Sequence, residues 1–210
     1  MFLNSTGTKY LIFTNGDELF YMNSASPGAA TEVTDGDLPV PHLPYPVFLD
    51  GYLFLATDRG DIYNSDLDDP TAWTPGDYIT AEIDGDGLTA LVKVKNYIVA
   101  LGKRGMEFFY DAANLSGSPL GRNESYYKAI ATYDGVTQIG DDVYFIGGPV
   151  NHGLRIYRLR ENDCLPISNS TVERILNNTS TLYTRSLSTT ANSPRFLGHC
   201  FSTNGRNFYL

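Results

Sequence analysis

The stretch YIVALGKRGMEFFYD, residues 97–111, decides how this chain folds, because its pattern occurs five times in the sequence. A run of aliphatic and aromatic residues stops at a polar turn that contains glycine, and a second run rich in tyrosine or phenylalanine follows. This pattern predicts a β-hairpin. The other four copies are centred on Gly16, Gly60, Gly153 and Gly205.

The spacing of the copies predicts the architecture. With Gly105 in third place, successive glycines are 44, 45, 48 and 52 residues apart, a range typical of repeat proteins. Because each unit is built from strands, the indicated class is an all-β propeller, or part of one, with four-stranded blades. The expected blades are roughly 1–46, 47–87, 88–134, 135–184 and 185–210 in a single domain.

Individual strands follow from apolar runs and turn residues. The hairpin at 9–22 is expected to turn tightly at Asn15-Gly16, where both residues tolerate positive φ. Prolines 39, 41, 44 and 46 exclude a central strand before a short one at Val47 to Leu49. We expect the segment LDDPTAWTPG, residues 67–76, to be a loop, and the third unit to close near YYKAIAT, residues 126–132.

One helix is expected among the strands. Ser170 and Glu173 have the spacing of a capping box, and Val172, Ile175 and Leu176 fall on one helical face. These features predict a helix at about 171–178. The last unit stops in the middle of an apolar strand, whose open edge would need a partner. Either the N-terminal segment completes that blade by pairing with it, or the sequence is a piece of a longer protein, which is the interpretation we favour.

Composition narrows the possible functions. The chain has 210 residues, 15 of them tyrosine, and a formal charge of −9 with no basic run longer than a pair. That balance disfavours ordinary binding of a phosphate backbone. The two cysteines, Cys164 and Cys200, form no zinc or disulfide framework, which favours a reduced, intracellular site of assembly. We identify neither a signal peptide nor an apolar run long enough to span a membrane.

The run from Asp50 to about Leu176 resembles the packaged-DNA stabilisation proteins of short-tailed bacteriophages, also described as tail hub or nozzle proteins. The resemblance lies in four segments in consistent order: DIYNSDLDDPTAW, AEIDGDGLTALVKVKNYIVALGKRGMEFFYDAANLSGSPL, KAIATYDGVTQIGDDVYFIGG and ISNSTVERIL. No single motif in these segments carries chemistry, so their order over more than half of the chain is the specific signal.

The resemblance implies a non-enzymatic structural role. Such a protein would be a β-propeller of the virion tail, assembled in the bacterial cytoplasm. It would form a ring, a hexamer by resemblance, below the portal and its adaptor and help to retain the genome. Its partners would be other copies of itself, the adaptor, and the tail needle, spikes or fibres. DNA would pass the acidic channel without sequence-specific contact, and no cofactor or membrane is implied.

Motifs for enzymatic chemistry are weak, and we assign no catalytic, cofactor or metal residues. There is no nucleophile elbow, and Ser116-Gly117-Ser118 has the composition of a turn. His199 and Cys200 are adjacent on a predicted strand and would point to opposite faces. His42 and His152 are isolated, and Asp84-Gly85-Asp86-Gly87 lacks the rest of a calcium loop.

A glycan-binding or sialidase-like propeller is the alternative. The turns at 57–60 and 202–205 each fall one residue short of the S-x-D-x-G pattern, and the acid pairs Asp68-Asp69 and Asp141-Asp142 could face each other. This alternative predicts that residues such as Arg104, Glu107 and Tyr110 converge. Since alternate strand residues face opposite sides, one of Phe108, Phe109 and Tyr110 must lie on a second surface.

Overall fold

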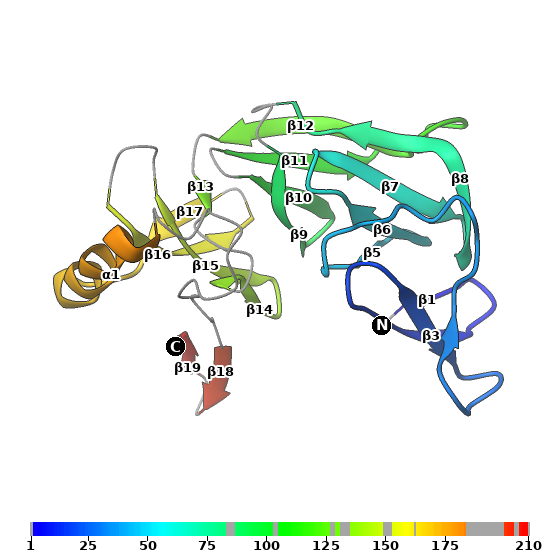
Figure 1. Cartoon of the computed structure of the whole chain (residues 1–210), viewed down its shortest axis with the longest axis horizontal. Helices are drawn as coiled ribbons and strands as arrows, with labels where there is room; N and C mark the ends of the chain where they lie inside the picture. Colours follow the sequence, from blue (N-terminus) through cyan, green and yellow to red (C-terminus); the bar gives the residue numbers. More distant parts are fainter. Residues whose placement is uncertain are drawn as a thin grey trace. The chain divides into compact units, whose positions relative to one another are not determined.

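The computed structural model of the chain describes residues 2–82, 87–102, 105–126, 129–130, 135–148, 153–161, 163–183, 200–203 and 206–209. The described residues divide into two compact units, which are treated separately. Unit 1 comprises residues 1–102 and 106–126, and unit 2 comprises residues 103–105 and 127–210. Their elements are antiparallel sheets and one helix, as the sequence predicts (Figure 1).

Unit 1 contains three four-stranded antiparallel sheets, each formed from strands consecutive in the chain. The first sheet consists of β1 (Phe2–Leu3), β2 (Lys9–Thr14), β3 (Leu19–Asn23) and β4 (Thr31–Glu32). The second consists of β5 (Val47–Leu49), β6 (Tyr52–Ala56), β7 (Asp61–Asp66) and β8 (Asp69–Thr80). The third consists of β9 (Leu88–Val94), β10 (Tyr97–Gly102), β11 (Met106–Asp111) and β12 (Leu120–Tyr126).

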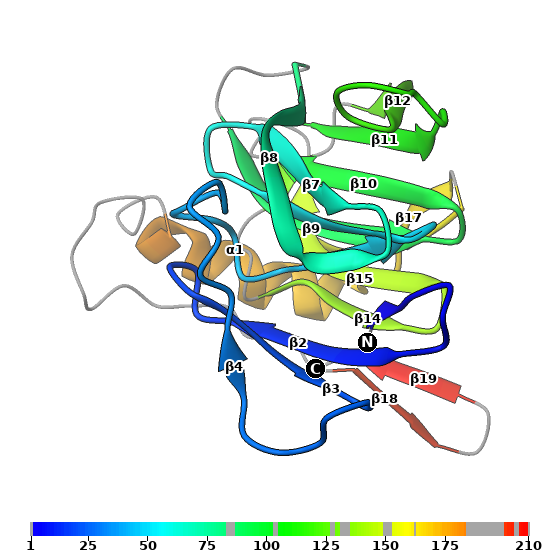
Figure 2. The same ribbon diagram turned by 90° about the vertical axis from the view of Figure 1, so that its right-hand side faces the viewer.

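The three sheets of unit 1 form successive layers, with the second in the middle (Figure 2). Alternate residues of β6 pack toward the first sheet and toward the third, because neighbouring side chains on a strand face opposite sides. Leu53 and Leu55 pack in a core shared with the first sheet, and Phe54 and Ala56 pack in a core shared with the third. The second sheet is therefore covered by protein on both faces.

Unit 2 contains a five-stranded sheet, a two-stranded sheet and the helix. Strands β15 (Asp142–Gly148), β16 (Arg155–Arg160) and β17 (Asp163–Pro166) are consecutive, and β13 (Ala129–Ile130) and β14 (Thr137–Ile139) both pair with β15. The pair β18 (Cys200–Thr203) and β19 (Arg206–Tyr209) forms the two-stranded sheet. All five predicted hairpins are thus present as antiparallel strand pairs.

Helix α1 (Ser170–Tyr183) confirms the predicted helix, although it is longer than expected and begins differently. Asn169, not Ser170, caps it: the Asn169 Oδ1 accepts a hydrogen bond from the backbone N–H of Val172 at 3.0 Å. Leu176 packs with Ile146 of β15, whereas Ile175 is 59% exposed, so only part of the predicted apolar face is buried. Within the described part, α1 is neither long nor apolar enough to cross a membrane.

Three local predictions were also wrong. The turn after β2 spans four residues, because Thr14 pairs with Leu19, and of Asn15 and Gly16 only Gly16 has positive φ. Residues 69–80 form strand β8 despite two prolines, since β8 lies at the edge of its sheet. The third sheet closes with β12, and the later Ala129–Ile130 pairs with β15 instead.

Candidate functional site

An ion-pair network on one face of the third sheet includes a buried carboxylate. The Glu107 side chain is 1% exposed, and its Oε2 lies 2.9 Å from the Nε of Arg122 on β12. The same guanidinium donates to the carbonyl oxygen of Thr80 at 2.7 Å and to Glu82 at 3.3 Å. Arg122 therefore ties the third sheet to the end of β8 in the second.

This network does not create the converging site that a sialidase-like enzyme needs. Glu107 and Phe109 share a face of β11, whereas Tyr110 lies on the opposite face and is 43% exposed. Arg104 lies outside the described residues. Phe108 and Phe109 are fully buried on opposite faces, which confirms that the three aromatic residues serve two surfaces.

The acid pairs named in the sequence have structural partners. Asp142 accepts two hydrogen bonds of 2.5 Å from the guanidinium of Arg160, which lower the pKa of the Asp142 carboxyl. Asp68 accepts the backbone N–H of Ser5, and Asp69 accepts both the N–H and the hydroxyl of Thr71. The carboxylates of Asp68, Asp69 and Asp142 thus accept hydrogen bonds that fix local structure.

His42 is the one histidine that the structure describes, and it is buried between two loops. Its Nδ1 lies 2.8 Å from the carbonyl oxygen of Pro39, so this nitrogen carries a proton. Its Nε2 lies 2.6 Å from the Thr14 hydroxyl, which is also 2.6 Å from the carbonyl oxygen of Glu18. Burial lowers the His42 pKa, against the opposing effects of Pro39 and Asp17.

The Thr14 hydroxyl therefore has two possible acceptors and one proton. With neutral His42 it donates to the imidazole; with charged His42 the ring donates instead, and the hydroxyl turns to Glu18. His152, His199 and the acidic residues Asp84 and Asp86 lie outside the described residues. Within the described parts of the chain, no group of three or more histidine, cysteine, aspartate or glutamate side chains could hold a metal ion.

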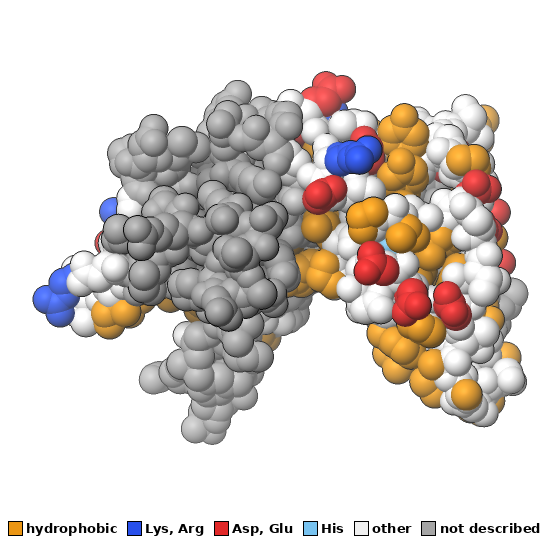
Figure 3. Space-filling model, viewed as in Figure 1, with side chains coloured by type: hydrophobic (Ala, Val, Ile, Leu, Met, Phe, Trp, Pro, Cys, Tyr) orange, Lys and Arg blue, Asp and Glu red, His pale blue; other side chains and the backbone are white. Residues whose placement is uncertain are grey.

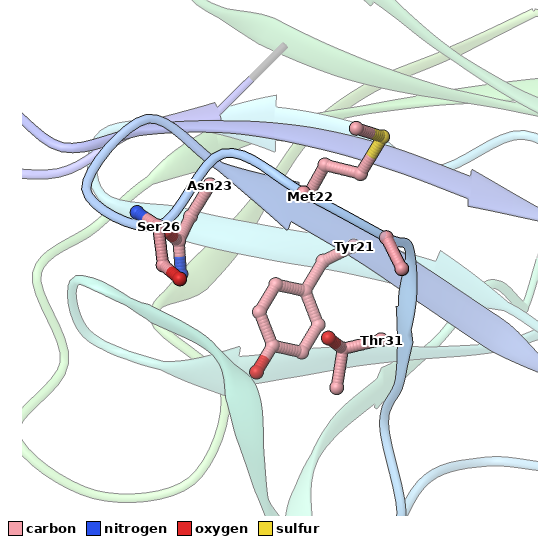
Figure 4. Close-up of a pocket in the computed structure, with 7 residues that line it drawn as sticks. Tyr21, Met22, Asn23, Ser26 and Thr31 are labelled. Atoms are coloured by element: carbon pink, nitrogen blue, oxygen red, sulfur yellow. The ribbon is translucent and has the colours of Figure 1, made fainter.

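A hollow of about 340 Å³ lies under the loop that joins β3 to β4 (Figure 4). The backbone N–H of Ser26 donates to the Asn23 Oδ1 at 2.7 Å and fixes the rim, while Tyr21 lies below it. Its lining carries hydroxyl and amide groups but no carboxylate and no basic side chain, so it contains no acid–base pair for catalysis. The lining residues are Tyr21, Met22, Asn23, Ser26, Gly28, Ala29 and Thr31.

Exposed apolar side chains are a further feature of unit 1. Leu3, Leu11 and Phe13 of the first sheet are 45%, 55% and 39% exposed, and Leu115, in the loop between β11 and β12, is fully exposed. Contiguous exposed apolar surface marks interaction sites. The exposed face of the first sheet could not be predicted, because the alternation of residues along β2 does not show which face is covered. Leu115, in contrast, lies within the polar run NLSGSP, so its exposure could have been predicted from the sequence.

Two solved structures match this chain at low sequence identity. The N-terminal domain of Nup159 matches with 11% identity and a TM-score of 0.44, over 73% of this chain and 43% of that one. The β-propeller domain of Vanderwaltozyma polyspora Nup133 matches with 12% identity and a TM-score of 0.43, over 95% of this chain and 60% of that one. The chain thus spans less than two thirds of both matched structures.

A search of curated proteins found no match. The family model described as "Bacteriophage P22 Gp10, beta-propeller" matches residues 2–195, which is nearly the whole chain. That family agrees with four-stranded antiparallel sheets in succession, which are the blades of a propeller. The chain therefore belongs to the phage stabilisation family of β-propeller proteins, represented by Gp10 of bacteriophage P22.

Proposed function

We propose that this chain is a structural component of a short phage tail. In this role it forms a hub or nozzle, a ring below the portal and its adaptor, and helps to retain the packaged genome. The observation that carries the proposal is the family match over residues 2–195. The role is non-enzymatic, in the virion tail, after assembly in the bacterial cytoplasm.

The blades of the ring component would be the sheets described above, at roughly 1–46, 47–87, 88–134 and 135–184, with a further unit from 185. Six copies would form the ring, by resemblance, and the adaptor and the tail needle, spikes or fibres would be its other partners. The sheet cores support a rigid building block, because buried side chains fill both faces of the middle sheet of unit 1.

The charge distribution supports a channel that DNA crosses without adhering. Unit 1 has 18 acidic and five basic residues, and unit 2 has six acidic and ten basic residues. A surface built from unit 1 would repel phosphates, so retention of the genome would depend on protein that closes the channel. Basic side chains lining the channel of an assembled ring would contradict this part of the proposal.

Light scattering tests the proposal directly. The mass of the purified chain is measured alone and after mixing with a candidate adaptor ring. A stoichiometric complex with the adaptor supports the tail-hub function. A chain that ignores the adaptor but binds or cleaves glycans would overturn it in favour of the alternative, which no described residue cluster favours at present.

A further inference from the structure

Two carboxylates of the second sheet face the third sheet. Asp66 lies two residues after Asn64 on β7, and Asp77 lies two residues before Ile79 on β8. Asn64 pairs with Phe54, which packs in the core between the two sheets, and Ile79 packs against the same core. Side chains two residues apart on a strand share a face, so both carboxylates lie on the face that meets the third sheet.

A third carboxylate, that of Asp111, faces the second sheet from the third. Asp111 ends β11, two residues after Phe109, and it pairs with Leu120 on β12. Phe109 and Leu120 both pack in the core between the two sheets. The Asp111 side chain therefore lies on the face that meets the second sheet, where Tyr52 begins β6 and packs against the same core.

The charges of these carboxylates act on one another and on Tyr52. Burial and nearby negative charge raise the pKa of the Tyr52 hydroxyl, and the carboxylates responsible are, in decreasing order, those of Asp111, Asp77, Asp66 and Asp68. The Asp77 pKa is raised as well, by burial and by the charge of Asp66. In the described part of the chain, no lysine, arginine or histidine forms an ion pair with Asp66, Asp77 or Asp111. The three carboxylates therefore carry negative charge that no side chain neutralises.

Asn64 supplies a buried oxygen on the same face. The residue is 2% exposed, and its Oδ1 has no hydrogen-bond partner among the described residues. Its Nδ2 donates to the carbonyl oxygen of Ser65 at 3.1 Å, which fixes the amide group and leaves Oδ1 as an acceptor. Like Asp77 on β8, Asn64 adjoins the cross-strand pair of Tyr63 and Tyr78. Because a buried acceptor without a partner is unfavourable, a ligand that supplies positive charge or a donor is expected here.

The chemistry of these groups selects the class of ligand. Unit 1 has 18 acidic and five basic residues, and Figure 3 shows acidic side chains on the right-hand part of that view, over unit 1. Carboxylate, amide and water oxygens are the ligands of Ca²⁺, and Mg²⁺ is held by one or two carboxylates and keeps several waters. Among the described residues, no three acidic side chains are grouped so that they could hold one metal ion together. An ion bound here therefore keeps part of its water shell.

We propose that unit 1 binds a hydrated divalent cation, Ca²⁺ or Mg²⁺, between its second and third sheets. The Asn64 Oδ1 and the carboxylates of Asp66 and Asp77 bind the ion from the second sheet. The Asp111 carboxylate balances its charge from the third sheet, across water. The ion thus joins the two sheets that the Arg122 network also joins. This inference goes beyond the proposed function and does not depend on it.

Titration with the metal alone tests the site. The natural chain is freed of metal with EDTA, dialysed, and titrated with CaCl₂ and, separately, with MgCl₂ by calorimetry, while thermal unfolding is followed in parallel. We expect one ion per chain and an unfolding temperature that rises with metal concentration, because a ligand that binds only the folded chain stabilises it. NaCl at equal ionic strength controls for general screening of the acidic charge. The metal that binds more tightly identifies the ion.

Two conservative substitutions locate the ion. Asp77→Asn and Asp111→Asn should each weaken metal binding at least about tenfold, and asparagine keeps an oxygen that can accept the N–H of Ala113, as Asp111 does. Without metal, Asp77→Asn should be more stable than the natural chain, because a neutral side chain no longer repels Asp66. The matched control is Asp37→Asn, at an exposed position outside this site, and it should bind metal as the natural chain does.

Three outcomes would overturn the proposal. They are a natural chain that binds neither metal, an Asp77→Asn variant that binds metal as tightly as the natural chain, and an Asp37→Asn variant that loses as much affinity as Asp77→Asn. The last result would show that the metal only screens the overall charge. None of these measurements involves the adaptor, so failure of the cation site is distinguishable from failure of the proposed function.

Discussion

The first and second sheets of unit 1 have the same strand pattern but different surroundings. In β6 both sets of alternate residues are buried, with Leu53, Phe54 and Leu55 at most 2% exposed. In β2 one set packs inward, whereas Leu11 and Phe13 of the other set remain 55% and 39% exposed. The sequence of a strand can therefore show that both of its faces carry apolar residues. Whether both faces are buried, and so stabilise the fold, depends on the neighbouring sheets.

The largest expected effect is the loss of a phenylalanine from the covered sheet. Phe54→Ala leaves a cavity between the second and third sheets and should lower the free energy of unfolding by about 3–5 kcal/mol. Phe13→Ala on the exposed face of the first sheet should lower the free energy of unfolding by about 1 kcal/mol, mainly through the loss of stacking on Phe20. Urea unfolding, followed by the fluorescence of the single tryptophan, Trp73, measures the free energy of unfolding of both variants. Equal losses of stability would contradict the difference between the covered and the exposed sheet.

The ion-pair network should matter because it joins two layers. Arg122→Met removes the guanidinium that pairs with the buried Glu107 carboxylate and should lower the free energy of unfolding by about 3 kcal/mol. Adding Glu107→Leu should recover much of that loss, since the carboxylate no longer needs a partner. A double variant as unstable as the single one would show that the cost lies elsewhere.

Gly87 lies at the junction of the second and third sheets, at a position with no room for a side chain. Its φ is +79°, and a Cβ there would lie 1.7 Å from the backbone oxygen of Asp58. Gly87→Ala should therefore lower the free energy of unfolding by about 2 kcal/mol. Gly28→Ala is the control, because a Cβ at Gly28 meets nothing within 4 Å and lies near the first sheet. A small loss in the first variant would mean that the turn relaxes easily.

The smallest expected effect concerns pH and the first sheet. The His42 pKa is lowered in the folded chain, so below pH about 6.5 the unfolded chain takes up the proton first. Stability should be independent of this group at higher pH and should fall as pH decreases through the folded pKa. The difference in unfolding free energy between the natural chain and His42→Gln, measured from pH 8 to 5, should show this dependence; a flat difference would contradict it.

The sequence predicted the repeated hairpins and their order because glycine turns and apolar runs are local signals. It did not predict the first part of β8, where Pro70 and Pro75 suggested a loop, since the edge position that tolerates proline is a property of the whole sheet. The Arg122 network was also missed: Glu107 and Arg122 meet across β11 and β12 only through an irregular register. The helix cap was misplaced by one residue because Asn169 and Ser170 are both good caps.

The two prolines in β8 have a consequence for how copies can join. A proline lacks the N–H that an added strand would need, so the outer edge of β8 is a poor template for backbone pairing. Polymerisation of amyloid type, in which chains grow by strand addition, is thereby discouraged along this edge. Copies that meet through side-chain surfaces instead can separate and rearrange.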